Sequence, residues 1–183
     1  MKRIYLMGMK HTGKSVHGKA IAAALGRKFC DTDALIQELD STETGMRRTV
    51  RDIYIEDGAE RFHRLEIAAC RLVTERESRL VVATGGGLCD NPEALSTTEG
   101  SLRVHLVDSL QSIASRIFRR GIPAFLHTSD EAVARRRFRA LYDRRTVAYD
   151  ETADIRVDLT DLSIQEAQSR IINAIEEYQR AGK

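Results

Sequence analysis

Hydrophobic positions along the chain form short runs of branched residues that alternate with longer stretches of helical spacing. The short runs are bounded by Gly, Asp or Ser and predict strands at residues 3–6, 28–30, 80–83, 103–106 and 155–159. Apolar residues three and four apart predict helices at residues 14–25, 50–54, 60–74, 110–119, 131–147 and 164–179. This alternation is typical of a parallel sheet that is covered by helices on both faces.

The pattern therefore predicts an α/β fold, a three-layer αβα sandwich around a five-stranded parallel sheet. A chain of 183 residues has the length of one domain, so we expect residues 1–183 to form a single domain. Residues 121–130 contain Gly121 and Pro123 and show little periodicity. They predict a mobile loop between two arginine-rich helices.

Composition excludes several classes of protein. Hydrophobic residues make up 42% and charged residues 31%, as in an ordinary soluble protein and unlike a disordered or fibrous one. The three cysteines show no metal-binding spacing and predict reduced thiols in a cytoplasmic protein. The chain has no apolar run of about 18 residues and a net charge of only +2, so we expect neither a membrane nor a nucleic-acid partner. We expect a monomer that acts on a small molecule.

A phosphate-binding motif lies directly between the first predicted strand and the first predicted helix. Residues 8–15 read GMKHTGKS and fit GxxxxGK[ST]. Glycines allow the backbone N–H groups to point at phosphate oxygens, and the helix adds its positive N-terminal end. A lysine reaches the β and γ phosphates, and a hydroxyl supplies one oxygen to Mg²⁺. The residues expected to contact nucleotide are Gly8, Lys10, His11, Thr12, Gly13, Lys14 and Ser15.

These residues predict a phosphotransferase that uses ATP and Mg²⁺. The alternative is a chance match, which average composition produces in roughly one chain per hundred of this length. The strand before the motif and the helix after it make such a coincidence rarer still.

The order of the motifs along residues 4–158 resembles the shikimate kinase family. Beyond the phosphate loop, the resemblance rests on Asp31-Thr32-Asp33, on Phe62 through Glu66, on Gly85-Gly86-Gly87, on an arginine-rich lid at about residues 119–131, and on Arg145 through Tyr149 and Glu151 to Asp154. It implies a P-loop fold like that of nucleoside monophosphate kinases, with a mobile lid. It also implies ATP-dependent phosphorylation of shikimate at the 3-hydroxyl, giving shikimate 3-phosphate in aromatic amino acid biosynthesis.

Two aspartates follow the second predicted strand, at the carboxyl end of the sheet where ligands collect. Asp31 and Asp33 lie two residues apart at this end of the sheet. The resemblance implies that Asp31 helps to hold Mg²⁺ through water and that Asp33 orients or deprotonates the attacking hydroxyl. The alternative is that Asp33 is the N-cap of a helix, because an apolar helical pattern follows it.

The resemblance places the acceptor-binding region at about residues 33–66, together with the glycine motif and one arginine. Three consecutive glycines permit close approach of a small ligand, although an ordinary turn is the alternative. The planar guanidinium of Arg145 can hold a carboxylate through two parallel hydrogen bonds. The residues expected to contact the acceptor are Asp33, Tyr54, Phe62, His63, Glu66, Gly85, Gly86, Gly87 and Arg145.

Further arginines lie around the predicted lid. The position of Arg116 resembles that of the arginine that stacks on adenine in the family, and Arg119 and Arg120 flank the lid, where they can reach phosphates. The alternative for all three is surface charge.

The chain departs from the family pattern in two places. His63 stands where the family has a carboxylate-binding arginine, and a neutral imidazole should weaken carboxylate binding by about 1 to 3 kcal/mol. No arginine occupies the expected place in the lid, so Arg119 or Arg120 would have to replace it. Two other hypotheses follow: a kinase of a different small polyol or nucleotide, or a nucleotide-binding protein without turnover. Lys14 and Asp33 favour an active kinase over the second of these.

Overall fold

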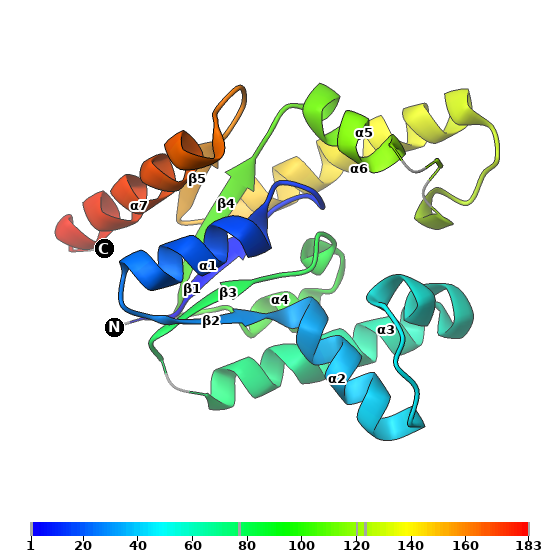
Figure 1. Cartoon of the computed structure of the whole chain (residues 1–183), viewed down its shortest axis with the longest axis horizontal. Helices are drawn as coiled ribbons and strands as arrows, with labels where there is room; N and C mark the ends of the chain where they lie inside the picture. Colours follow the sequence, from blue (N-terminus) through cyan, green and yellow to red (C-terminus); the bar gives the residue numbers. More distant parts are fainter. Residues whose placement is uncertain (1, 77, 120, 123, 183) are drawn as a thin grey trace.

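The computed structural model describes residues 2–76, 78–119, 121–122 and 124–182. Five strands form one sheet in the order β2-β3-β1-β4-β5, and every neighbouring pair is parallel (Figure 1). The strands are β1 (Ile4–Met7), β2 (Lys28–Asp31), β3 (Leu80–Ala83), β4 (Leu102–Val107) and β5 (Ile155–Asp158). The predicted five-stranded parallel sheet is confirmed.

Helices cover both faces of this sheet, which confirms the three-layer sandwich. On one face lie α1 (Lys14–Ala24) and α7 (Ile164–Arg180), whose apolar side chains form one core cluster with the sheet. On the other face, a second cluster joins the sheet to α2 (Thr32–Thr44), α3 (Val50–Glu75), α4 (Pro92–Ser96) and α6 (Glu131–Thr152). Within the described part of the chain, none of the helices combines the length and the apolar character needed to cross a membrane.

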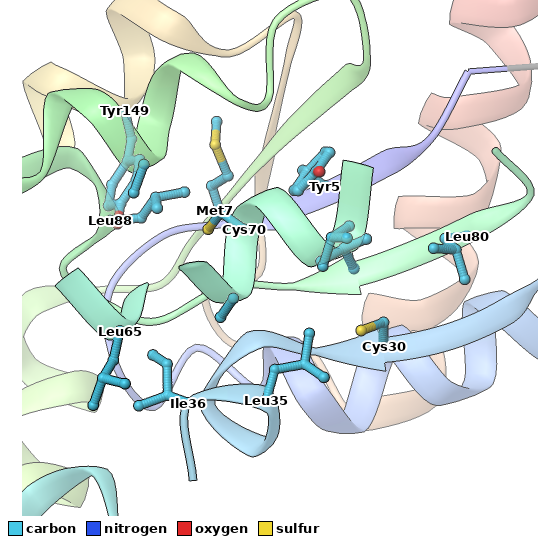
Figure 2. Packing of buried hydrophobic residues seen from close by; sticks show 14 of the residues in the cluster. Tyr5, Met7, Cys30, Leu35, Ile36, Leu65, Cys70, Leu80, Leu88 and Tyr149 are labelled. Carbon is cyan, nitrogen blue, oxygen red and sulfur yellow. The ribbon is translucent and has the colours of Figure 1, made fainter. Parts of the chain in front are cut away.

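Strand β1 lies at the centre of the sheet, and its side chains alternate between the two clusters. Ile4 and Leu6 pack toward α1 and α7, whereas Tyr5 and Met7 pack into the second cluster (Figure 2). All four side chains are fully buried, and a buried aliphatic side chain contributes about 1.5 to 3 kcal/mol. The end of β1 is therefore a firmly held base for the loop that follows it.

A third, smaller cluster lies outside the sheet. It joins α5 (Leu110–Phe118), the amino-terminal half of α6 and the 3₁₀ turn η2 (Ala124–Leu126), with Phe118 and Phe138 in edge-to-face contact at 5.9 Å. Arg137 Nη1 donates to the carbonyl oxygens of Leu126 and His127, at 2.7 and 2.8 Å. The predicted loop at residues 121–130 thus contains a turn that is tied to α6; Pro123 lies outside the described residues.

Helix boundaries differ from the prediction at several points. The apolar helical pattern after Asp33 is the helix α2, which had no predicted bounds. Its N-cap is Asp31, whose Oδ1 accepts from the Asp33 N–H at 3.0 Å, so Asp33 is not the cap. The two predicted helices at residues 50–54 and 60–74 belong to α3 and are separated at Gly58, which has φ 83° and ψ 174°. Helix α6 extends beyond residue 147 to Thr152, and α4 was not predicted.

Figure 1 shows α2 with the first part of α3 on one side of the carboxyl end of the sheet, and α5 with the start of α6 on the other. The loops after β1 and β3 lie between these two groups of helices, next to the point where β2 passes directly into α2. The predicted site residues lie on these loops and on the helices beside them.

Candidate active site

The loop after β1 has the backbone conformation of a phosphate cradle. Gly8 and Gly13 have φ values of 133° and 84°, and His11 also has a positive φ of 69°. A side chain at Gly8 would collide with the carbonyl oxygen of Leu106, so this position requires glycine. Thr12 closes the turn because its hydroxyl donates to the Met9 carbonyl at 2.9 Å.

The ammonium group of Lys14 lies inside this loop. Its Nζ donates to the carbonyl oxygens of Gly8 and Met9, each at 2.8 Å, and the side chain is buried. Burial lowers the pKa of Lys14 to about 8, and the nearby charges of Asp33 and Asp31 limit the decrease. Burial removes water from the ammonium group, and a phosphate group in the loop would stabilise its positive charge in place of that water. The loop therefore favours a polyanion.

At the mouth of the loop, Ser15 contacts the acidic end of β2. Its hydroxyl donates to Asp31 Oδ2 at 2.6 Å, while the other oxygen of Asp31 caps α2. A hydroxyl and a carboxylate are hard oxygen donors of the kind that Mg²⁺ prefers, and Mg²⁺ takes most of its remaining ligands from water and phosphate. The pair therefore fits a magnesium ion next to the phosphate loop.

Two carboxylates, Asp33 and Glu66, flank Gly85. A Cβ added to Gly85 would lie 3.1 Å from Asp33 Oδ1 and 3.2 Å from Glu66 Oε1. Burial raises the pKa of Asp33, and the charge of Asp31 adds to the increase. Burial also raises the pKa of Glu66 to about 7, although the hydrogen bond from Asn91 Nδ2 at 3.0 Å opposes it. Both acids can therefore take up or release a proton closer to neutral pH than an exposed carboxylate would.

The other two glycines of the motif face different parts of the site. A Cβ at Gly86 would lie 2.5 Å from the backbone nitrogen of Lys10 in the phosphate loop. A Cβ at Gly87 would lie 3.0 Å from Arg145 Nη2. The motif thus brings together the phosphate loop, the carboxylates and the arginine that the sequence analysis had singled out separately, and the tight packing explains why side chains are absent here.

The guanidinium of Arg145 is engaged on two sides. Nη1 donates to the Gly86 carbonyl at 3.0 Å, while Nε and Nη2 donate to Asp90 Oδ2 at 3.0 and 2.7 Å. Asn91, the next residue, donates to the His63 carbonyl at 3.1 Å as well as to Glu66. Sequence analysis did not identify Asp90 or Asn91; their position on the loop directly after the glycine motif is the signal that would have found them.

Aromatic side chains form a half-buried wall on α3. Tyr54 and Phe62 meet edge to face at 5.7 Å, and Phe62 and His63 lie 6.2 Å apart. The wall is linked to the glycine loop because Asn91 holds the His63 carbonyl. An apolar wall beside two carboxylates and an arginine suits a small, ring-shaped polar molecule.

The predicted nucleotide-side arginines differ in their surroundings. Arg116 Nη1 donates to the His11 carbonyl at 2.9 Å and forms an ion pair with Asp108 Oδ2 at 2.6 Å, so this arginine is held against the phosphate loop. Arg119 is exposed. Burial lowers the pKa of His11, and Arg119 is among the neighbouring cations that lower it further. Arg120 lies outside the described residues.

Comparisons with known proteins point to one family. Residues 10–176 match the family model described as Shikimate kinase. A shikimate kinase of Pelotomaculum thermopropionicum is 33% identical over 179 residues, covering 97% of this chain and 98% of that protein. One of Geobacter sulfurreducens is 34% identical, covering 97% and 93%. The solved structure of shikimate kinase from Acinetobacter baumannii in complex with shikimate has a TM-score of 0.77 at 24% identity, covering 100% of this chain and 95% of that one, a likeness of fold.

Proposed function

The chain belongs to the shikimate kinase family, and on this premise we propose that it transfers the γ-phosphoryl group of ATP to the 3-hydroxyl of shikimate. The observation that carries the proposal is the packing of three glycines against three groups. Gly85 faces Asp33 and Glu66, Gly86 faces the phosphate loop, and Gly87 faces Arg145. A phosphate donor and a carboxylated acceptor bound to these groups would meet at the glycine motif.

On the donor side, the backbone N–H groups of residues 8–15 would surround the phosphates, and Lys14 would neutralise charge on the γ-phosphoryl group. Lys14 would exchange its two carbonyl partners for phosphate oxygens as the nucleotide enters. Ser15 and Asp31 would hold Mg²⁺, which supplies positive charge at the phosphates when bound. Arg116 would pack against adenine, and Arg119 would supply the charge of the missing lid arginine.

On the acceptor side, Asp33 would orient the 3-hydroxyl and accept its proton. The hydroxyl oxygen would bond to the γ-phosphorus as the bond to the bridging oxygen of ADP breaks, and ADP would leave with that electron pair. A carboxylate whose pKa is raised by burial accepts a proton more readily than an exposed one. The transfer would depend mainly on positioning and on electrostatic stabilisation.

Arg145 would bind the carboxylate of the acceptor, and Tyr54, Phe62 and His63 would contact its ring. Glu66 would complete the polar side of the site, next to Asp33. We propose that residues 33–66 form the acceptor-binding region and that residues 119–131 act as a lid within one domain. These roles agree with the proximity of the side chains and are each open to substitution experiments.

The function is tested by measuring ADP release with shikimate and with a panel of other polyols and nucleosides. We expect turnover with shikimate that needs Mg²⁺ and that falls by at least about a hundredfold in Asp33→Asn, because the general base is lost. Asp143→Asn is a matched control, since it removes an exposed carboxylate from α6. A kcat/KM for another acceptor far above that for shikimate would overturn the proposal.

The monomeric state and the cytoplasmic location expected from the sequence stay predictions. Light scattering after size-exclusion chromatography tests the first, and cell fractionation tests the second.

A further inference from the structure

Two adjacent arginines of α6 hold the carboxylate of Asp90. Arg145 donates to Oδ2 from Nε and Nη2, at 3.0 and 2.7 Å. Arg144 donates from Nη1 to Oδ1 at 2.7 Å and from Nη2 to Oδ2 at 3.3 Å. An acid of the same chain is therefore bonded to the guanidinium that is proposed to bind the acceptor carboxylate.

The position of Arg145 does not depend on Asp90 alone. Its Nη1 donates to the Gly86 carbonyl at 3.0 Å, and a Cβ on Gly87 would lie 3.0 to 3.7 Å from its guanidinium atoms. Backbone therefore holds the guanidinium from a second direction. Removing the charge of Asp90 would change which anion Arg145 attracts and leave the guanidinium in place.

Arg144 gives Asp90 a second partner that faces solvent. The side chain of Arg144 is 59% exposed, compared with 17% for Arg145. Burial opposes ionisation of Asp90, but the hydrogen bond from Arg144 and the charges of both arginines outweigh it and lower the pKa of this carboxyl. Asp90 is ionised at neutral pH, and if it releases Arg145 it keeps Arg144 as a cationic partner.

The charge balance of the site makes this competition important. His63 stands where the resemblance leads us to expect a second carboxylate-binding arginine. The carboxylate of the acceptor would therefore meet one arginine, and that arginine is already shared with Asp90. The affinity for a carboxylate then depends on the free energy needed to break the ion pair between Asp90 and Arg145.

From these contacts we propose that Asp90 determines the affinity of the site for a carboxylated acceptor, by competing for Arg145. Arg144 receives the Asp90 carboxylate when the acceptor binds. The inference rests on the proposed function for the choice of acceptor and for the role of Arg145. It adds a specificity-determining residue that neither touches the reacting hydroxyl nor binds nucleotide.

The test is isothermal titration of shikimate, in the presence of ADP and Mg²⁺, into the full-length protein and its variants. Asp90→Asn keeps an oxygen that accepts from the arginines and removes the charge, so shikimate should bind at least about tenfold more tightly. Arg144→Gln should weaken shikimate binding about threefold or more, because Asp90 then has no other cation to pair with. Asp143→Asn, which removes an exposed charge on the same helix, should bind shikimate as the unaltered protein does.

The carboxamide of shikimate separates charge competition from a change of shape. Asp90→Asn should leave its affinity within about twofold, because a neutral ligand does not compete with Asp90 for the full charge of Arg145. Equal or weaker shikimate binding by Asp90→Asn would overturn the inference, as would equal tightening for the carboxamide. Melting curves identify a variant that does not fold, and Arg144→Gln then provides an independent test.

Turnover measured in parallel keeps the two proposals apart. Turnover of shikimate by the unaltered protein, without tighter binding by Asp90→Asn, would uphold the function and overturn the role of Asp90. Tighter binding by Asp90→Asn, without turnover of shikimate by the unaltered protein, would support the role of Asp90 and overturn the function.

Discussion

The substitution Gly86→Ala tests the central contact of the site, where the glycine motif meets the phosphate loop. The added Cβ would lie 2.5 Å from the backbone nitrogen of Lys10, 2.9 Å from its Cα and 3.0 Å from its Cβ. Because two of these atoms are backbone, the clash cannot be relieved by rotating a side chain. Either the phosphate loop or the glycine loop must move.

Overpacking of this kind costs about 1 to 3 kcal/mol, which corresponds to a decrease of about 2 to 12 °C in melting temperature for a chain of this size. Displacement of the loop should also weaken ATP binding by about tenfold or more, because the N–H groups no longer converge on the phosphates. Differential scanning fluorimetry and titration of ATP measure the two effects.

Gly87→Ala is the matched control, because the three atoms nearest to its Cβ all belong to the Arg145 guanidinium, at 3.0 to 3.7 Å, whereas those nearest to the Cβ at Gly86 belong to Lys10. We expect it to weaken shikimate binding and to leave ATP affinity within about twofold. If Gly86→Ala binds ATP and melts as the unaltered protein does, the close approach of the two loops is not a feature of the protein in solution, and the reasoning fails.

Two further predictions concern the carboxylates of the site. Asp31→Asn should retain the N-cap of α2 and raise the Mg²⁺ concentration needed for half-maximal activity, whereas Asp31→Ala should also lose about 1 kcal/mol of stability with the cap. Mg²⁺ titrations measure the first effect and melting curves the second. An unchanged Mg²⁺ requirement in Asp31→Asn would exclude the metal role. Burial raises the pKa of Glu66 from its ordinary value of 4.5 to about 7, so the folded state binds this proton more tightly than the unfolded state. The free energy of unfolding should therefore fall by up to about 3 kcal/mol as the pH rises from about 4.5 through 7. Glu66→Gln keeps an acceptor for Asn91, so its melting temperature should exceed that of the unaltered protein at pH 8 and approach it near pH 4; parallel pH profiles of the two proteins would contradict this.

Local sequence carried most of the information about the fold. The inner strands β1 and β3 were easiest to place, because parallel strands that are buried on both faces are apolar throughout. The edge strands β2 and β5 carry exposed polar residues and were placed from shorter apolar stretches. The start of α2 was not fixed by its apolar pattern, because the side chain of Asp31 sets it through a hydrogen bond from the Asp33 N–H. The extension of α6 to Thr152 depends on the burial of Tyr149 against the sheet, which is a tertiary contact.

Part of the site was also readable in the sequence. The phosphate loop is contiguous, and its glycines and lysine are required by backbone geometry and charge within eight residues. The acidic and glycine motifs follow strands, and the carboxyl ends of parallel strands meet at one edge of a sheet. Order and spacing along the chain were therefore sufficient to indicate a phosphotransferase with a nearby acceptor site.

The pairing of charges was decided only by the tertiary structure. Asp90 and Arg145 are 55 residues apart, Asn91 and Glu66 are 25 residues apart, and no periodicity links either pair. The same holds for the buried surroundings that raise the pKa of Glu66 and lower that of Lys14. Sequence specifies which groups are available, whereas packing determines which of them are desolvated and which neutralise one another, because both effects depend on distances of a few ångströms between segments remote along the chain.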